Sequence, residues 1–124
     1  MSSRKEVATA FLRHAATGDV RTAYDEYVSP RFRHHNPSFH GDAGSLSEAM
    51  EENASQFPEK TIDIEHAIEE ADFVAVHSRV RLHPQGPEIA TVHIFRFDAD
   101  DRVVELWDIG QPVPNDSPNE NGMF

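Results

Sequence analysis

A β-hairpin is predicted by the stretch Thr91-Val-His-Ile-Phe-Arg-Phe-Asp-Ala-Asp-Asp-Arg-Val-Val-Glu-Leu-Trp-Asp-Ile-Gly-Gln111. Two runs, residues 89–97 and 103–109, make up most of the hairpin and are rich in the β-branched and aromatic side chains that favour strands. The tip between them contains Asp and Ala but no strand former, and Asp tolerates the left-handed backbone of a tight turn. We therefore expect Asp100 and Asp101 to form a two-residue turn.

This turn determines which residues of the two strands face each other, because the pairs are found by counting outward from it. The expected pairs are Phe97 with Val104, Arg96 with Glu105, Phe95 with Leu106, Ile94 with Trp107, and His93 with Asp108. The oppositely charged pair is typical of a solvated face. The other face then holds His93 and Asp108 among apolar side chains. In such surroundings a carboxylate is harder to ionise than in water, and it can orient a neighbouring imidazole.

The composition limits the class of protein and its partners. A chain of 124 residues is long enough for one domain with a real core. Its 11 Lys and Arg residues against 22 Asp and Glu residues give a net charge of −11, which argues against binding to nucleic acid or to an anionic membrane. Without cysteine, the chain has no disulfide framework, thiolate metal site or Cys nucleophile. No apolar run is long enough for a membrane span or a signal peptide, so we expect a cytoplasmic protein.

Three helices are predicted in the first half of the chain. The first has a capping box formed by Ser3 and Glu6 and is expected to stop at Gly18. The second begins after Asp19 and is ended by Pro30. A short strand is expected to end at residue 36, and the third helix should begin near residue 45 or 47 and end at residue 58.

In the second half of the chain, apolar and polar side chains alternate with a period of two, which predicts strands. Residues 62–68 and 73–83 alternate apolar with polar side chains, and a Pro- and Gly-containing turn at 84–87 leads into the hairpin. Helices followed by a late sheet indicate an α+β fold with the helices on one face of the sheet. A curved, mixed or antiparallel sheet wrapped on three N-terminal helices leaves a cone whose mouth suits a small molecule. We assign residues 1–111 to this domain and residues 112–124 to an extended tail that could dock on the body or on a partner.

Several motifs, in this order and spacing, carry a resemblance to a known family. They are Tyr27 with His35-Asn36-Pro37, then Val92-His93-Ile94-Phe95-Arg96-Phe97, then Val103-Val104-Glu105-Leu106-Trp107-Asp108 with Gln111, and finally Asn121-Gly122-Met123-Phe124. Together they resemble the SnoaL-like polyketide cyclases of the NTF2-like superfamily, over nearly the whole chain. Members of that branch typically carry Gly in the hairpin tip, where this chain has Asp101.

The resemblance implies an intramolecular aldol condensation in an apolar pocket, without a cofactor. An acidic residue on the last strand and a histidine on the preceding strand act as the acid–base pair in such cyclases, and these roles fall on Asp108 and His93. Ketosteroid isomerases of the same superfamily have their base where Asn36 stands and their tyrosine near Phe11, and neither residue here can do that chemistry. The resemblance also implies a homodimer formed sheet to sheet.

Other side chains are candidates for binding the substrate, which we expect to be a small hydrophobic or polyketide-like molecule. They are Phe11, Tyr27, His35, Asn36, Met50, Phe57, Phe95 and Trp107. His34, His35 and His40 lie close in sequence but lack the regular spacing and the carboxylate of a metal site, and we assign no metal. Two alternatives stay open: a non-catalytic ligand-binding module, and a hydrolase or dehydratase that uses the same Asp/His pair.

Overall fold

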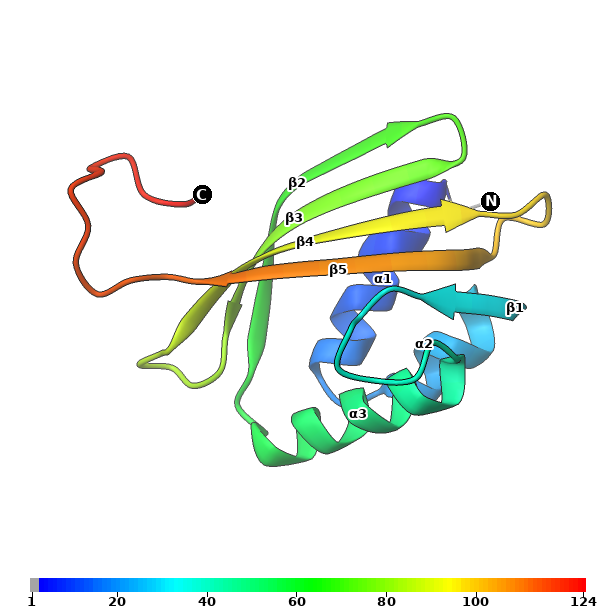
Figure 1. Cartoon of the computed structure of the whole chain (residues 1–124), viewed down its shortest axis with the longest axis horizontal. Helices are drawn as coiled ribbons and strands as arrows, with labels where there is room; N and C mark the ends of the chain where they lie inside the picture. Colours follow the sequence, from blue (N-terminus) through cyan, green and yellow to red (C-terminus); the bar gives the residue numbers. More distant parts are fainter. Residues whose placement is uncertain (1–2) are drawn as a thin grey trace.

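The computed structural model describes residues 3–124, which form three helices and a five-stranded sheet (Figure 1). The elements are α1 (Arg4–Ala16), α2 (Val20–Tyr27), β1 (Val28–His34), α3 (Ala43–Gln56), β2 (Thr61–Glu70), β3 (Phe73–Arg81), β4 (Glu88–Phe97) and β5 (Val103–Pro112). The order of strands in the sheet is β1-β5-β4-β3-β2. β1 is parallel to β5 and the other pairs are antiparallel, so the sheet is mixed and open. The three helices lie on one side of it, which confirms the α+β architecture.

The capping box predicted for α1 is present. The hydroxyl of Ser3 accepts a hydrogen bond from the backbone N–H of Glu6 (3.1 Å), and the Glu6 carboxylate accepts one from the backbone N–H of Ser3 (3.4 Å). These bonds satisfy two donors that a helix start would otherwise leave free. The chain leaves the helix through Gly18, whose φ of +90° is a conformation that glycine adopts without steric cost.

The predicted start of α3 was wrong by about one turn. The helix begins at Ala43, and its N-cap is Asp42 rather than Ser45. The Asp42 carboxylate accepts hydrogen bonds from the backbone N–H (2.9 Å) and the hydroxyl (2.7 Å) of Ser45. An anionic cap stabilises the positive end of the helix dipole more than a hydroxyl does, so the earlier residue takes the position.

The boundary between α2 and β1 also differs from the prediction. The helix ends at Tyr27, and Pro30 lies inside β1 instead of terminating α2. Proline is tolerated there because β1 is an edge strand whose register with β5 is interrupted between Val28 and Arg33. The strand ends at His34, two residues before the predicted end.

The register of the β4–β5 hairpin was predicted correctly except at its tip. His93 pairs with Asp108 and Arg96 with Glu105, as expected, but Phe97 pairs with Val103. The turn is longer than two residues: the Asp98 N–H donates to the Arg102 carbonyl (2.9 Å), and Asp101 has a φ of +59°.

A β-bulge compensates for this longer turn. The shift in register lies between Arg96 and Phe97 on β4, which leaves Val104 as the extra residue on β5. The bulge restores the pairing for the rest of the hairpin. His93 and Asp108 therefore stay directly opposite each other.

The core fills the space between the helices and the concave face of the sheet. Its fully buried centre joins Phe11 of α1 to Phe95 and Leu106 of the hairpin, with edge-to-face ring packing between Phe11 and Phe95 at 5.7 Å. Val74 and Val76 of β3 are also fully buried. This packing fixes the sheet against α1 and sets the depth of the cavity above it.

The tail after β5 returns to the outer face of the sheet. The ring of Phe124 stacks on His77 with 5.7 Å between centroids, and the guanidinium of Arg79 lies over the same ring at 4.2 Å. Both partners lie on β3, on the face away from the helices. Within residues 3–124, no helix is both long and apolar enough to cross a membrane.

Candidate functional site

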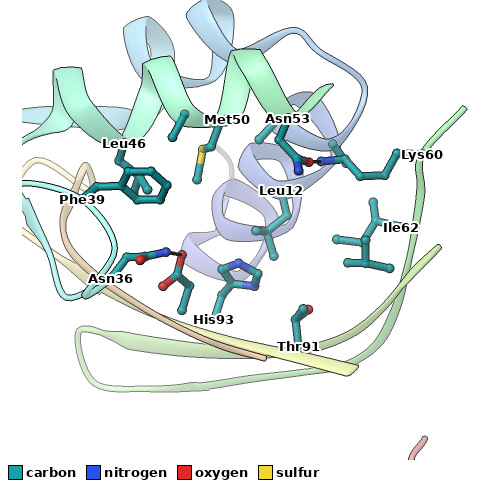
Figure 2. Close-up of a pocket in the computed structure, with 15 residues that line it drawn as sticks. Leu12, Asn36, Phe39, Leu46, Met50, Asn53, Lys60, Ile62, Thr91 and His93 are labelled. Carbon is teal, nitrogen blue, oxygen red and sulfur yellow. Dashed lines mark hydrogen bonds between the residues drawn. The ribbon is translucent and has the colours of Figure 1, made fainter. Parts of the chain in front are cut away.

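A cavity of about 320 Å³ opens between the helices and the concave face of the sheet (Figure 2). Its wall is mostly apolar, and its few polar side chains come from five separate segments of the chain. The residues that line it are Leu12, Ala15, Ala16, Asn36, Phe39, Leu46, Ala49, Met50, Asn53, Lys60, Ile62, Val80, Thr91, His93 and Asp108. An apolar cavity with a small number of converging polar groups is the usual form of a small-molecule site.

Asp108 is held by the loop that follows β1. The Asn36 side-chain N–H donates to Oδ2 of Asp108 (3.1 Å). The side-chain oxygen of Asn36, Oδ1, accepts from the backbone N–H of Ser38 (2.9 Å). The second bond fixes the orientation of the amide, so that its N–H₂ group faces the carboxylate. The other carboxylate oxygen, Oδ1 of Asp108, is buried and has no hydrogen-bond partner in the described chain.

His93 lies opposite Asp108 on the neighbouring strand. Its ring is enclosed by protein, apart from the surface that it gives to the cavity. Burial lowers the pKa of His93 below its ordinary value of 6.5, although the Asp108 charge acts in the opposite direction. The imidazole is therefore neutral near pH 7. Nδ1 of His93 and Oγ1 of Thr91, two residues before it, are also buried without a partner among residues 3–124.

A cation stands at the other end of the cavity. Lys60, just before β2, points toward Asn53 of α3, and its ammonium donates to the Asn53 side-chain oxygen. Figure 2 shows this pair across the cavity from Asn36, with Leu12 and Met50 between. Burial lowers the pKa of Lys60 below its ordinary value of 10.5.

The tyrosine nearest to this chemistry is Tyr24. Its hydroxyl donates to the Met50 sulfur (3.4 Å), and burial followed by the charge of Asp108 raises its pKa above the ordinary value of 10.0. Tyr27, the tyrosine selected from the sequence, does not line the cavity and lies beside His14 with 6.2 Å between ring centroids. Tyr24 does not line the cavity either, but its hydroxyl contacts the wall residue Met50 from behind.

The structure brings four of the predicted site residues to the cavity wall: Asn36, Met50, His93 and Asp108. Three predicted wall residues lie elsewhere. Phe11 and Phe95 are fully buried in the core below the cavity, and Phe57 packs on the His83 ring at 5.5 Å. These phenylalanines support the site without lining it.

His35 and Trp107 lie on the outer face of the sheet. Their rings stack at 4.7 Å, and His35 Nε2 lies 2.6 Å from the carboxylate of Glu105. They are therefore separated from the cavity by the sheet itself. The alternation along each strand explains this, since Trp107 directly precedes the inward-facing Asp108.

Three residues of the cavity wall were not predicted from the sequence: Phe39, Asn53 and Lys60. Asn53 carried a usable signal, because it falls on the apolar side of a predicted helix between Met50 and Ala54. Lys60 follows Pro58 in a loop, where no periodicity indicates a direction. No three His, Cys, Asp or Glu side chains of residues 3–124 are grouped as a metal site would need.

Comparison with known proteins identifies the family. The sequence model of the SnoaL-like domain family matches residues 8–106 of this chain. The chain belongs to the SnoaL-like family. A comparison with curated proteins gave no match.

Solved structures of SnoaL-like and NTF2-like proteins share the fold. AclR from Streptomyces galilaeus, provisionally assigned as a hydroxylase, is 22% identical with a TM-score of 0.74, over 87% of this chain and 88% of that one. A protein from Acidithiobacillus ferrooxidans, provisionally assigned as a polyketide cyclase, is 19% identical with a TM-score of 0.69, over 90% of each chain. A SnoaL-like protein from Agrobacterium tumefaciens, provisionally assigned as an isomerase, is 11% identical with a TM-score of 0.71, over 89% and 99%. At these identities the likeness establishes the NTF2-like fold.

Proposed function

We propose that this SnoaL-like protein is a cofactor-independent enzyme that moves a proton at a carbon flanked by carbonyl groups, in an aldol cyclisation or a related isomerisation. One observation carries the proposal. Asp108, His93 and Thr91 each have a buried polar atom without a hydrogen-bond partner in the described chain, on the wall of a mainly apolar cavity. Unpaired buried polar atoms are costly to a fold and mark functional sites. A substrate with carbonyl oxygens for His93 and Thr91, and with an acidic hydrogen for Asp108, would pair them.

Asp108 is the base in this proposal. Oδ2 is occupied by Asn36, so the free Oδ1 would take the proton from the substrate carbon. The resulting enolate carbon attacks an acceptor carbonyl of the same molecule and forms the new carbon–carbon bond. The alkoxide formed at the acceptor takes the proton back from Asp108, which leaves the enzyme unchanged.

His93 would stabilise the negative oxygen that develops in each step. Because burial lowers its pKa, the ring is neutral and donates a hydrogen bond without transferring its proton. The Thr91 hydroxyl lies on the same face of β4 and is a second donor. The apolar residues of α1 and α3 keep water away from the enolate, which strengthens both hydrogen bonds.

Proton exchange tests the base directly, without knowledge of the natural substrate. A panel of cyclic and open-chain 1,3-diketones is incubated in D₂O with the protein, and loss of the C–H signal is followed by NMR. We expect exchange above the buffer rate, and a fall of roughly 100-fold or more in Asp108→Asn, since general base catalysis contributes about 10²–10⁴-fold. Asp63→Asn, at an exposed position of β2, is the matched control.

Three outcomes contradict the proposal. Equal exchange by the wild type and Asp108→Asn would remove Asp108 as the base. Binding of the diketones without exchange would indicate a ligand-binding module. Incorporation of ¹⁸O from labelled water into the product would indicate a hydrolase that uses the same residues.

We also propose a homodimer formed through the outer face of the sheet. An apolar row crosses four strands in register, from Ile68 through Ala75 and Ile94 to Trp107. Ile68 is 65% exposed, and Ile109, two residues after Trp107 and on the same face, is 60% exposed. A continuous apolar surface of this kind is typical of a protein interface.

A further inference from the structure

We propose that Lys60 forms an anion-binding subsite and that the substrate of this cavity carries a carboxylate at the end away from Asp108. The inference rests on the proposed function for the reaction and adds the chemical class of the molecule. It concerns Lys60 and Asn53, which the proposed proton transfer does not use.

The first observation is the position of the charges along the cavity. Asp108 and Lys60 are the anion and the cation among the lining residues, and His93 between them is neutral. Figure 2 shows Lys60 at the opposite end from Asn36, the hydrogen-bond partner of Asp108. A bound molecule that spans the cavity therefore meets a base at one end and an ammonium group at the other.

The second observation is that Lys60 has no carboxylate partner among residues 3–124. None of the ion pairs in residues 3–124 includes Lys60, although the chain has twice as many acidic as basic residues. Its hydrogen bond goes to the neutral amide of Asn53. A partly buried ammonium without a counter-ion is unfavourable, and its lowered pKa reflects the same cost. An anionic ligand would supply the missing charge.

The third observation is that the side chain has no structural task that requires a charge. The turn before β2 is closed by the backbone, where the Lys60 N–H donates to the Phe57 carbonyl (3.0 Å). Any residue other than proline can make this bond. The ammonium is thus not needed to form the turn, and its placement on the cavity wall calls for another explanation.

A carboxylate fits these groups better than a neutral carbonyl does. An ammonium ion has three donors, and the Asn53 amide occupies one of them. The side-chain N–H₂ of Asn53 also lies at this end and can donate to the same oxygen pair. A net charge of −11 repels anions at long range, so binding of a carboxylate depends on a local cation.

Binding of two isosteric probes tests the subsite. The probes are 2-naphthoate and the neutral 2-naphthamide, and affinity is measured by calorimetry at pH 7. We expect the wild type to bind 2-naphthoate more tightly than 2-naphthamide. The affinity of Lys60→Met for 2-naphthoate should be lower by about tenfold or more, since a hydrogen bond to a charged group contributes that much binding energy. The affinity of Lys60→Met for 2-naphthamide should differ from that of the wild type by less than about twofold, because this neutral probe loses no charged partner.

The chain offers a matched control, because Lys5 is its other lysine and lies exposed on α1. Lys5→Met removes the same charge and should keep the preference for 2-naphthoate. A readout of folding separates binding from structure: removal of a partly buried, unpaired charge should raise the melting temperature of Lys60→Met, whereas loss of a structural contact would lower it.

The result can also overturn the inference. The inference is contradicted if the wild type binds neither probe or binds both with equal affinity. It is also contradicted if Lys60→Met prefers 2-naphthoate to 2-naphthamide as strongly as the wild type does. Failure here is distinguishable from failure of the proposed reaction. Asp108→Asn should lose proton exchange but bind 2-naphthoate at least as well as the wild type, because it removes an anion from the same cavity.

Discussion

Asn36 and Asp108 are joined by a 3.1 Å hydrogen bond from the side-chain amide to the carboxylate, although 72 positions separate them in sequence. This bond ties the loop after β1 to the last strand of the sheet. It leaves one carboxylate oxygen engaged and the other free for chemistry. Asn36 is therefore a positioning residue for the proposed base.

Replacement of Asn36 by leucine should slow diketone exchange about tenfold or more, because a hydrogen bond to a charged group is lost. Asn115→Leu, on the exposed tail, is the control. An exchange rate equal to that of the wild type would show that Asn36 only fills space.

Tyr24→Phe and Tyr27→Phe form a matched pair on one helix. Neither tyrosine lines the cavity, but the Tyr24 hydroxyl bonds the wall residue Met50 and is influenced by the charge of Asp108, whereas Tyr27 packs beside His14. We expect Tyr24→Phe to lower the exchange rate by about two- to tenfold and to leave the melting temperature nearly unchanged, because the ring packing is kept. Tyr27→Phe should leave the rate unchanged. A larger effect at Tyr27 would contradict the placement of α2.

The sequence could predict most of the fold because its strongest signals are local. The alternation along residues 89–109 fixed which side chains face inward, and a longer turn at the tip did not change this, because the bulge at Val104 restored the register. Counting alone cannot detect such compensation. The bulge depends on the hydrogen bond between Asp98 and Arg102 that closes the loop. The length of that loop is not visible in the alternation of the strands.

The site was less predictable for a physical reason. Three site residues lie on or next to strands: Asp108, His93 and Asn36. There the alternation of side chains predicts which face of the sheet each one lies on. Lys60 lies in a loop, and its direction depends on where α3 ends relative to β2. The choice between Tyr24 and Tyr27 likewise depends on the rotation of the short helix α2 against α1, to which periodicity is insensitive.

Glu105 should make folding stability depend on pH in the acidic range. Arg33 is the main cause that lowers the Glu105 pKa from 4.5 to about 2, with further hydrogen bonds from His35 and Arg96. Because the folded-state pKa lies below the unfolded one, this stabilisation is complete above the unfolded value of about 4.5 and is lost as pH falls through the folded value of about 2.

Urea unfolding of Glu105→Gln tests this linkage. At pH 7 the variant should be less stable by about 1.5–3 kcal/mol, the usual contribution of a hydrogen bond to a charged group. The difference should shrink steadily as pH is lowered toward 2. A constant difference between pH 7 and pH 2 would mean that Glu105 acts through packing rather than charge.

Ile109→Glu tests the proposed homodimer. The side chain is 60% exposed on the outer face, beside the apolar row that ends at Trp107, and a charge there would be buried in a sheet-to-sheet interface. We expect the dimer dissociation constant to rise about 100-fold, as for loss of an interface hot spot, measured by sedimentation or light scattering across a dilution series.

Ser55→Glu adds the same charge on the exposed surface of α3, on the helical side of the sheet, and should leave the assembly intact. The cavity lies on that side too, so diketone exchange per subunit should persist in the Ile109→Glu monomer. A wild type that stays monomeric at high concentration would contradict the dimer. Equal dissociation of both variants would point to net charge, rather than the apolar row, as the determinant of assembly.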